Sequence, residues 1–323
     1  MSAPAIEVRG LTRRFGDVTA VDHLSLTVTG PGVFGFLGAN GAGKTTAIRM
    51  LVGLIHPTQG EILLFGEPAE KGGTDLRSKM GYLPQDPAFY PWMTGEEYLR
   101  HAADLFGLDR KDGRGRIGEL LEISGLSQAA RRRVGGYSGG MKQRLGIAQA
   151  LINDPELILL DEPVSALDPV GRAEVLELVR TLGEKATVFM SSHILADVER
   201  VCEEVAIIDE GKLLIHERTA SLRAGAIRPI VTCRVRGRGE RLEEMLRDES
   251  WVADVRHEPD QEGSNAETLR MTVTDLAEAE QGLPRIIARA GVGLVSLAPV
   301  TPSLEEVFIE LVGKSAKSEE RPS

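Results

Sequence analysis

The sequence Gly38-Ala39-Asn40-Gly41-Ala42-Gly43-Lys44-Thr45-Thr46 contains the pattern G-x-x-x-x-G-K-[ST] and decides what fold the chain needs. The apolar run 33–37 before it is typical of a buried strand, and residues 45–52 after it have helical spacing. Backbone N–H groups of a glycine loop between a strand and a helix form a nest for phosphate oxygens, and the helix dipole adds partial positive charge. We therefore predict a nucleotide triphosphate site.

Two side chains of this loop have specific expected roles. Lys44 is expected to reach the β- and γ-phosphates and to act in catalysis, and Thr45 is expected to hold Mg²⁺. The other nucleotide-binding positions predicted in the loop are Gly38, Asn40, Gly41, Gly43 and Thr46. The alternative is a glycine-rich turn that fits the pattern by accident, which we expect in about one chain in a hundred of this length.

Composition limits the class of protein. A chain of 323 residues, 42% of them hydrophobic, is long enough for about two domains. A formal net charge of −10 argues against nucleic acid or an anionic membrane surface as the main partner, because both require a basic face. The two cysteines, Cys202 and Cys233, fit neither a disulfide framework nor a zinc site, so a reducing cytoplasm is expected. No apolar stretch approaches the ~18 residues that span a bilayer.

The pattern of residues 6–216 predicts an α/β domain with a largely parallel central sheet, because short β-rich runs alternate with helical segments. Strands disappear over about 86–153, where we predict a helical insert. There, Thr94-Gly95-Glu96-Glu97 is a capping-box start for a helix. The predicted strands cover 6–9, 18–28, 33–37, 61–65, 80–83, 157–160, 187–190, 205–209 and 212–216.

After about Ala226 the pattern changes to the order βαββαβ, which predicts a small α+β domain of the ferredoxin-like type. We place the α/β domain at 1–225, the accessory domain at 226–313 and a polar, disordered tail at 314–323. A second capping box, at 303–306, precedes a predicted helix at 307–312.

Two adjacent carboxylates follow the buried apolar run 157–160. Ligands of open α/β sheets bind beyond the carboxyl ends of the strands. Asp161 is therefore expected to hold Mg²⁺, and Glu162 to accept a proton from the water that attacks the γ-phosphate. A pair of acids at a strand-to-loop junction without any ligand is the alternative, and the phosphate loop upstream makes it the less favoured one.

A second glycine-rich segment, Ser138-Gly139-Gly140, stands just before the helical run 141–152. Small residues and free N–H groups at the start of a helix again suit a phosphate surface. A glycine-rich N-cap without a ligand is the alternative. However, the longer segment Tyr137-Ser138-Gly139-Gly140-Met141 resembles the signature of ABC-type ATPases, and it lies between the phosphate loop and the acid pair in that family's order.

The resemblance covers about residues 6–216 and implies roles for further residues. Phe15 would stack on adenine, Gln85 would sense Mg²⁺ and the attacking water, Asp168 would join the nucleotide-binding set, and His193 would contact the γ-phosphate. Met141 departs from the glutamine and Tyr137 from the leucine that many members carry, so the hydrogen bond of that glutamine is not expected here.

The family resemblance also implies a head-to-tail pair of ATPase subunits, either a homodimer or a heterodimer. Each ATP would lie between the phosphate loop of one subunit and the segment 138–140 of the other. Phosphoryl transfer depends on positioning and charge neutralisation, so a site completed by a second subunit couples dimerisation to hydrolysis.

The extension that ends in 302–309 resembles the tails of bacterial ATPases that drive drug and antibiotic exporters, including the daunorubicin-resistance type. The resemblance implies an ATP-hydrolysing subunit at the cytoplasmic face of the membrane, with the permease as a separate chain. The acidic composition counts against a nucleic-acid partner, so none is expected. We predict that the aromatic run 89–93 docks on the permease, with packing inside the insert as the alternative. The accessory domain is expected to regulate or stabilise the dimer, or only to pack.

Two other functions stay open from the sequence. One is a soluble ATP switch that regulates a partner without transport. The other is the ATPase of a system for lipid, polysaccharide or metal-enzyme maturation.

Overall fold

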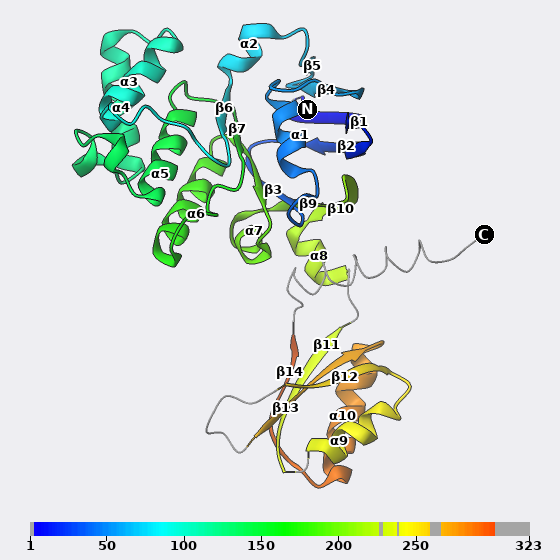
Figure 1. The fold of residues 1–323 in the computed structure, drawn as a ribbon. Coiled ribbons are helices and arrows are strands. Elements are labelled where there is room, and N and C mark those ends of the chain that lie inside the picture. Colours follow the sequence, from blue (N-terminus) through cyan, green and yellow to red (C-terminus); the bar gives the residue numbers. More distant parts are fainter. Residues whose placement is uncertain (1–2, 226–228, 238, 259–265, 301–323) are drawn as a thin grey trace. The chain divides into compact units, whose positions relative to one another are not determined.

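The computed structural model describes residues 3–225, 229–237, 239–258 and 266–300. The chain divides after Thr219 into two compact units, at the start of the short helix α8 (Thr219–Gly225) (Figure 1). The predicted capping box at 303–306, the helix after it and the tail lie outside the described residues.

Six strands form the main sheet of the first unit, in the order β10-β9-β3-β8-β7-β6. The five strands from β9 to β6 pair in parallel, and β10 pairs antiparallel with β9. The prediction of a largely parallel sheet is therefore confirmed. The strands are β3 (Gly32–Leu37), β6 (Met80–Leu83), β7 (Leu157–Leu160), β8 (Thr187–Ser192), β9 (Glu204–Asp209) and β10 (Lys212–Arg218).

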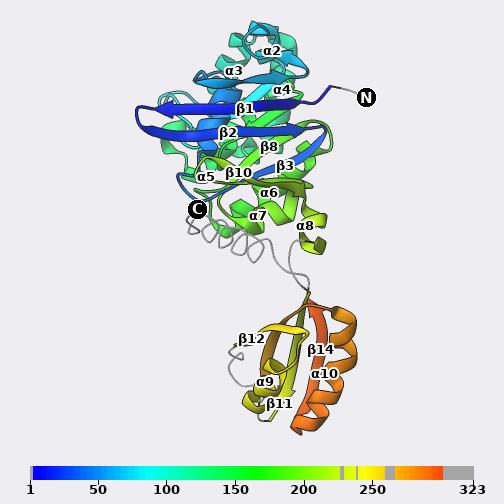
Figure 2. The ribbon, with the colours of Figure 1, turned by 90° about the vertical axis from the view of Figure 1, so that its right-hand side faces the viewer.

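A second, antiparallel sheet of the first unit has the order β2-β1-β4-β5, and Figure 2 shows β1 and β2 side by side across the unit. The sequence did not separate these strands from the parallel sheet, because alternation of apolar and polar residues does not say which strands pair. The strand β1 also runs past its predicted end at Arg9, through shifts in register, to Phe15. The strands are β1 (Ile6–Phe15), β2 (Val18–Val28), β4 (Gln59–Leu64) and β5 (Glu67–Pro68).

The helix α1 (Lys44–Leu51) joins the two sheets, because its apolar side chains share one core with residues of both. On the other face of the main sheet lie α6 (Pro169–Gly183) and α7 (Leu195–Val201). Close approach there explains Gly35 of β3: a Cβ at this position would lie 2.6 Å from Cγ1 of Val198 in α7.

Helices occupy the chain between β6 and β7. They are α3 (Gly95–Leu105), α4 (Arg110–Ile123) and α5 (Gly139–Ala150), with single 3₁₀ turns at Ser127–Ala129 and Val134–Gly136; α2 (Gly73–Ser78) precedes β6. The predicted capping box is confirmed: the Glu97 N–H donates to Thr94 Oγ1 at 3.2 Å, and the Thr94 N–H donates to Glu97 Oε2 at 2.8 Å. These bonds satisfy N–H groups at the helix start that lack partners within the helix.

The second unit has the predicted order βαββαβ. Its sheet, β12-β13-β11-β14, is antiparallel throughout, which is the ferredoxin-like arrangement. An apolar core that includes Cys233, Leu269 and Leu283 joins the sheet to both helices. The elements are β11 (Ile230–Arg236), α9 (Gly239–Arg247), β12 (Val252–Glu258), β13 (Glu267–Val273), α10 (Leu276–Ala290) and β14 (Gly293–Val300).

Candidate active site

The carboxyl ends of four neighbouring strands meet at one edge of the main sheet. The phosphate loop follows β3, Ser191 lies at the end of β8, the acid pair follows β7, and Gln85 follows β6. Because these strands are parallel and adjacent, residues that are far apart in the sequence lie together at this edge.

A cavity of about 260 Å³ opens at this edge. Its walls are formed by Ala20, Asn40, Gly41, Gly43, Lys44, Thr45, Thr46, Gln85 and Glu162. Two further predicted residues are not part of this wall but form hydrogen bonds with residues that are. The carbonyl oxygen of Gly38 accepts a hydrogen bond from Lys44, and a carboxylate oxygen of Asp161 accepts one from Thr45.

The start of α1 faces the cavity without a protein cap. Gly43, the residue before the helix, has φ 104°, and a Cβ there would lie 2.3 Å from the carbonyl oxygen of Ala20. Only glycine fits this position. The helix has no side-chain cap and no acidic residue in its first turn, so its first N–H groups are suited to an anion.

Lys44 is buried, with 6% of its side chain exposed. Its Nζ donates to the carbonyl oxygens of Gly38 at 2.8 Å and Ala39 at 3.1 Å, and lies 3.3 Å from Oε1 of Glu162. A buried ammonium group requires such partners, because an unpaired one would be costly. The loop thus holds a positive charge at the cavity wall.

The carboxylate of Asp161 is fully buried. Its Oδ1 accepts hydrogen bonds from Ser191 Oγ at 2.7 Å and Thr45 Oγ1 at 3.2 Å, whereas its Oδ2 is buried and has no hydrogen-bond partner among the described residues. Burial raises the pKa of Asp161, and the two hydroxyl donors oppose that rise. A carboxylate with one unused oxygen beside a threonine hydroxyl fits the oxygen ligands that Mg²⁺ prefers.

No group of three or more His, Cys, Asp or Glu side chains in the described part of the chain forms a metal site by itself. Mg²⁺ is typically held by one or two protein oxygens together with nucleotide phosphates, so the small donor set here suits that arrangement.

Glu162 connects Lys44 with His193. Its backbone has φ 51°, a left-handed conformation that is unusual for a residue with a side chain, and its N–H donates to Ser191 Oγ at 2.9 Å. Its Oε2 lies 2.8 Å from Nδ1 of His193, whose side chain is 37% exposed. Such strain is found at functional sites, where the surrounding structure holds it in place.

Ser191 is a residue of this site to which the sequence analysis gave no role. Leu160 of β7 pairs with Met190 of β8, so the next residues, Asp161 and Ser191, lie side by side. The Ser191 hydroxyl holds both acidic residues, through the Asp161 carboxylate and the Glu162 backbone. Its only signal in the sequence is its place two positions before His193.

The segment 138–140 and Asp168 lie outside the cavity wall. Ser138 caps α5 by accepting a hydrogen bond from the Met141 N–H at 3.2 Å, and Asp168 caps α6 by accepting one from the Gly171 N–H at 2.9 Å. The two caps are neighbours: a Cβ on Gly140 would lie 3.1 Å from Cδ2 of Leu167. They form a second surface, on which Ser138 and Gly139 are exposed.

Phe15 lies at the end of β1 and is 46% exposed. The guanidinium carbon of Arg13 is 4.5 Å from the centroid of its ring, a cation–π distance. Arg13 therefore covers one face of this ring.

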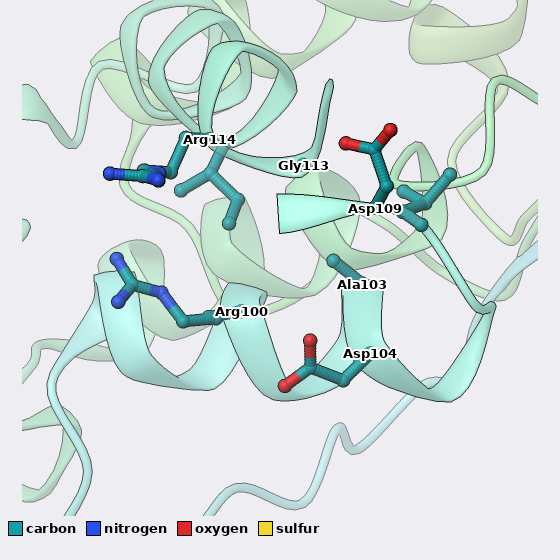
Figure 3. Close-up of a pocket in the computed structure, with 8 residues that line it drawn as sticks. Arg100, Ala103, Asp104, Asp109, Gly113 and Arg114 are labelled. Carbon is teal, nitrogen blue, oxygen red and sulfur yellow. The ribbon is translucent and has the colours of Figure 1, made fainter. Parts of the chain in front are cut away.

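A larger cavity, of about 370 Å³, lies between α3 and α4. Figure 3 shows Arg100 and Arg114 on one side of it and Asp104 and Asp109 on the other. It includes neither a glycine loop nor the carboxyl end of a strand. The smaller cavity carries the convergent polar groups, so we take that one as the candidate site.

Comparison with known proteins gives a consistent result. The family profile described as ABC transporter matches residues 21–165. The uncharacterized ABC transporter ATP-binding protein YxlF of Bacillus subtilis (strain 168) is 39% identical over 307 residues, which cover 95% of this chain and 99% of that protein. The daunorubicin resistance ATP-binding protein DrrA3 of Streptomyces coeruleorubidus is 34% identical over 325 residues, which cover 99% of each chain.

A solved structure described as the ATP binding subunit of an ABC transporter has a similar fold. Its TM-score is 0.63 and its identity is 30%, and the match covers 68% of this chain and 92% of the other.

Proposed function

Since this chain belongs to the ABC transporter family as an ATP-binding subunit, we propose that it hydrolyses ATP in the cavity beside Gly43 to drive export of an antibiotic-like molecule through a separate permease. The observation that carries the ATPase site is the contact of Glu162 with both Lys44 and His193 at the wall of that cavity. The export role is supported by the likeness to a daunorubicin resistance protein along 99% of both chains.

ATP binding uses the loop and the start of α1. The N–H groups of the loop take the phosphate oxygens, and Lys44 exchanges its bonds to the Gly38 and Ala39 carbonyls for bonds to the β- and γ-phosphates. Thr45, Asp161 and Gln85 would hold Mg²⁺, which when bound neutralises phosphate charge. Phe15 stacks on the adenine ring with the face that Arg13 does not cover.

Hydrolysis needs a base for the attacking water, and Glu162 takes that role. Its Oε2 contacts His193 and its Oε1 contacts Lys44, so both oxygens are held in place beside the cavity. His193 contacts the γ-phosphate and orients Glu162, and Gln85 lies on the same wall, where it can orient the water.

A second ATPase subunit completes the site. Ser138, Gly139, Gly140 and Asp168 lie outside the cavity wall of their own chain, on a surface where Ser138 and Gly139 are exposed. This surface therefore suits the ATP of a partner subunit.

The aromatic run 89–93 supplies a docking surface for the permease at the cytoplasmic face of the membrane. Phe89 packs against Tyr98, with ring centroids 4.9 Å apart. In contrast, the side chains of Tyr90 and Trp92 are 44% and 64% exposed, and the centroids of their rings are 5.2 Å apart. Exposed neighbouring aromatic side chains are typical of protein contacts. Among the described helices none is long and apolar enough to cross a bilayer.

The ATPase proposal is tested with Glu162→Gln, which keeps the size of the side chain but cannot accept a proton. We expect Mg²⁺-dependent phosphate release to fall by roughly 10² to 10⁴-fold, while ATP still binds and the variant accumulates as an ATP-bound dimer in size-exclusion chromatography. Equal rates and equal oligomeric states for the variant and the wild type would show that both the base and the dimer mechanism are wrong.

The docking surface is tested with Tyr90→Glu in co-purification with the permease. Ile123 at the end of α4 gives a matched control, because it is 45% exposed in the same insert but outside the aromatic run. We expect Tyr90→Glu to lose the permease and Ile123→Glu to retain it, with ATP hydrolysis by the isolated subunit unchanged in both. Retention by both variants would contradict docking at this surface.

A further inference from the structure

An ion pair that the proposed catalytic roles do not use joins the two helices behind the site. Nε and Nη2 of Arg172, in α6, both lie 2.6 Å from Oδ1 of Asp197, in α7. The Asp197 side chain is 4% exposed and that of Arg172 is 31% exposed. Oδ2 of Asp197 is buried and has no hydrogen-bond partner among the described residues. Removing Arg172 would therefore leave a buried carboxylate without its counter-charge.

Each member of the pair stands one helical turn after a loop of the proposed site. The Arg172 N–H donates to the carbonyl oxygen of Asp168 at 2.9 Å, so Arg172 follows the loop that ends in this cap. Asp197 stands four positions after His193. The pair thus connects the loop before α6 with the loop before α7, and the second loop carries the side chain that contacts Glu162.

Asp197 stands in the first turn of α7, so the ion pair acts directly on this turn. Its N-terminus has no side-chain cap, because Ile194 stands at that position. Farther along, Val198 is fully buried against Gly35 of β3, which anchors the middle of the helix. On the strand side, Ser192 Oγ accepts a hydrogen bond from the Ile194 N–H at 2.9 Å. On the helix side of His193, the bonds from Arg172 hold the Asp197 side chain.

The electrostatics agree with this geometry. Burial raises the pKa of Asp197, and the hydrogen bonds and charge of Arg172 oppose that rise. Arg172 therefore favours the charged form of the Asp197 carboxylate, which strengthens the ion pair between α6 and α7.

We propose that Arg172 and Asp197 are positioning residues for ATP hydrolysis, whose ion pair fixes the first turn of α7 and thereby the place of His193 against Glu162. The proposal rests on the proposed roles of Glu162 and His193. Because the pair also joins the loop that ends in Asp168, a movement of that loop is transmitted to His193. Neither residue touches ATP in this scheme, so we expect the pair to affect the rate of the chemical step more than the affinity for nucleotide.

The test compares Arg172→Ala, Asp197→Asn and Arg172→Lys in steady-state ATP hydrolysis, with folding checked by the midpoint of thermal unfolding. A small misplacement of a catalytic group costs on the order of tenfold to a hundredfold in rate. We expect kcat to fall about tenfold for the first two variants, with KM and ATP affinity within about twofold, and Arg172→Lys to recover part of kcat. Asp197→Asn keeps the size of the side chain and serves as the test if Arg172→Ala does not fold.

The matched control is Arg116→Ala, which removes another partly buried arginine with ion pairs, to Glu119 at 3.0 Å and to Asp154 at 3.1 Å, neither of which belongs to the two loops. We expect its kcat to stay within about twofold of the wild type. The positioning role is overturned if Arg172→Ala and Asp197→Asn keep kcat as Arg116→Ala does, or if KM changes as much as kcat. If Glu162→Gln itself hydrolyses ATP at the wild-type rate, the proposed function fails instead, so the two failures are distinguishable.

Discussion

The two units differ in what they bury. Among the described residues, every buried polar or charged side chain that we find lies in the first unit: Thr12, Lys44, Ser124, Gln143, Asp161, Glu162, Thr187, Ser191, Ser192, Asp197 and Thr219. The core of the second unit is built from apolar side chains and the thiol of Cys233. The first unit holds charges in a buried site, and the core of the second unit holds a sheet and two helices together.

This difference separates function from stability. Burying a charge is costly unless it is paired, and each buried charge of the first unit has a partner: Lys44 and Glu162 face each other, Asp161 has two hydroxyl donors, and Asp197 has Arg172. Sites of this kind reduce stability in exchange for reactivity. The apolar core of the second unit carries no such cost. Changes in one unit should therefore leave the other unaffected.

The largest effect is expected for Lys44→Met, which keeps the length of the side chain but removes its charge. Two charge-assisted hydrogen bonds of about 2 kcal/mol each are lost, so ATP affinity should fall by roughly 10³-fold in isothermal titration calorimetry. Lys79→Met is the control, because Lys79 is 45% exposed and pairs with Glu156 at 3.8 Å. Equal ATP affinities for the two variants would show that Lys44 does not bind ATP.

The next effect is on the second unit. Leu269→Ala removes a fully buried side chain of β13, and we expect a cost of about 3 kcal/mol in the free energy of unfolding of this unit. Trp251 lies in the same core, so its fluorescence during urea unfolding, in a Trp92→Phe background, follows this unit. Leu294→Ala is the control, since Leu294 is 50% exposed. A loss of ATP affinity in Leu269→Ala would break the separation between the units.

A smaller effect is expected for Ser191→Ala. The variant loses the bond to Asp161 and leaves the buried Glu162 N–H unpaired, which should cost about 2 kcal/mol in the first unit. Faster hydrogen exchange in β7 and β8, but not in β11 and β13, would show it. Ser78→Ala, at an exposed serine, is the control. Unchanged exchange in β7 and β8 would mean that Ser191 does not hold the acid pair.

The smallest effect uses the two cysteines, one in each unit. Burial raises the pKa of Cys233 to about 11 and raises that of Cys202 further, so neither thiol should react with an alkylating reagent at pH 8 unless its unit opens. ATP and Mg²⁺ at ten times the dissociation constant should slow alkylation of Cys202 about tenfold and leave Cys233 unchanged. Equal slowing of both, measured by mass spectrometry, would show that the units open together.

Local patterns predicted much of this molecule. The glycine loop, the apolar run before the acid pair, the capping box at Thr94 and the βαββαβ order each depend on residues close together in the sequence. The sequence pattern of the phosphate loop also predicts the elements on either side of it, because a nest of N–H groups that binds phosphate lies between a strand and a helix.

The pairing of strands could not be read in the same way. Apolar and polar residues alternate in the first strands of the chain as in any other strands. These strands nevertheless form a separate antiparallel sheet, in which Phe15 is the last residue of β1. Ser191 was missed because its role comes from the neighbouring strand, and Arg172 and Asp197 were missed because each looks like an ordinary charged residue on a helix.

The sequence by itself determined which chemical groups this protein has and on which local elements they stand, because caps, turns and periodicity arise from neighbouring residues. Only the tertiary structure decided which groups touch. The order β3-β8-β7 places Ser191 beside Asp161, and the packing of α6 and α7 on one face of the sheet joins Arg172 to Asp197. Those contacts depend on how distant segments bury their apolar faces together, and that is a property of the whole fold.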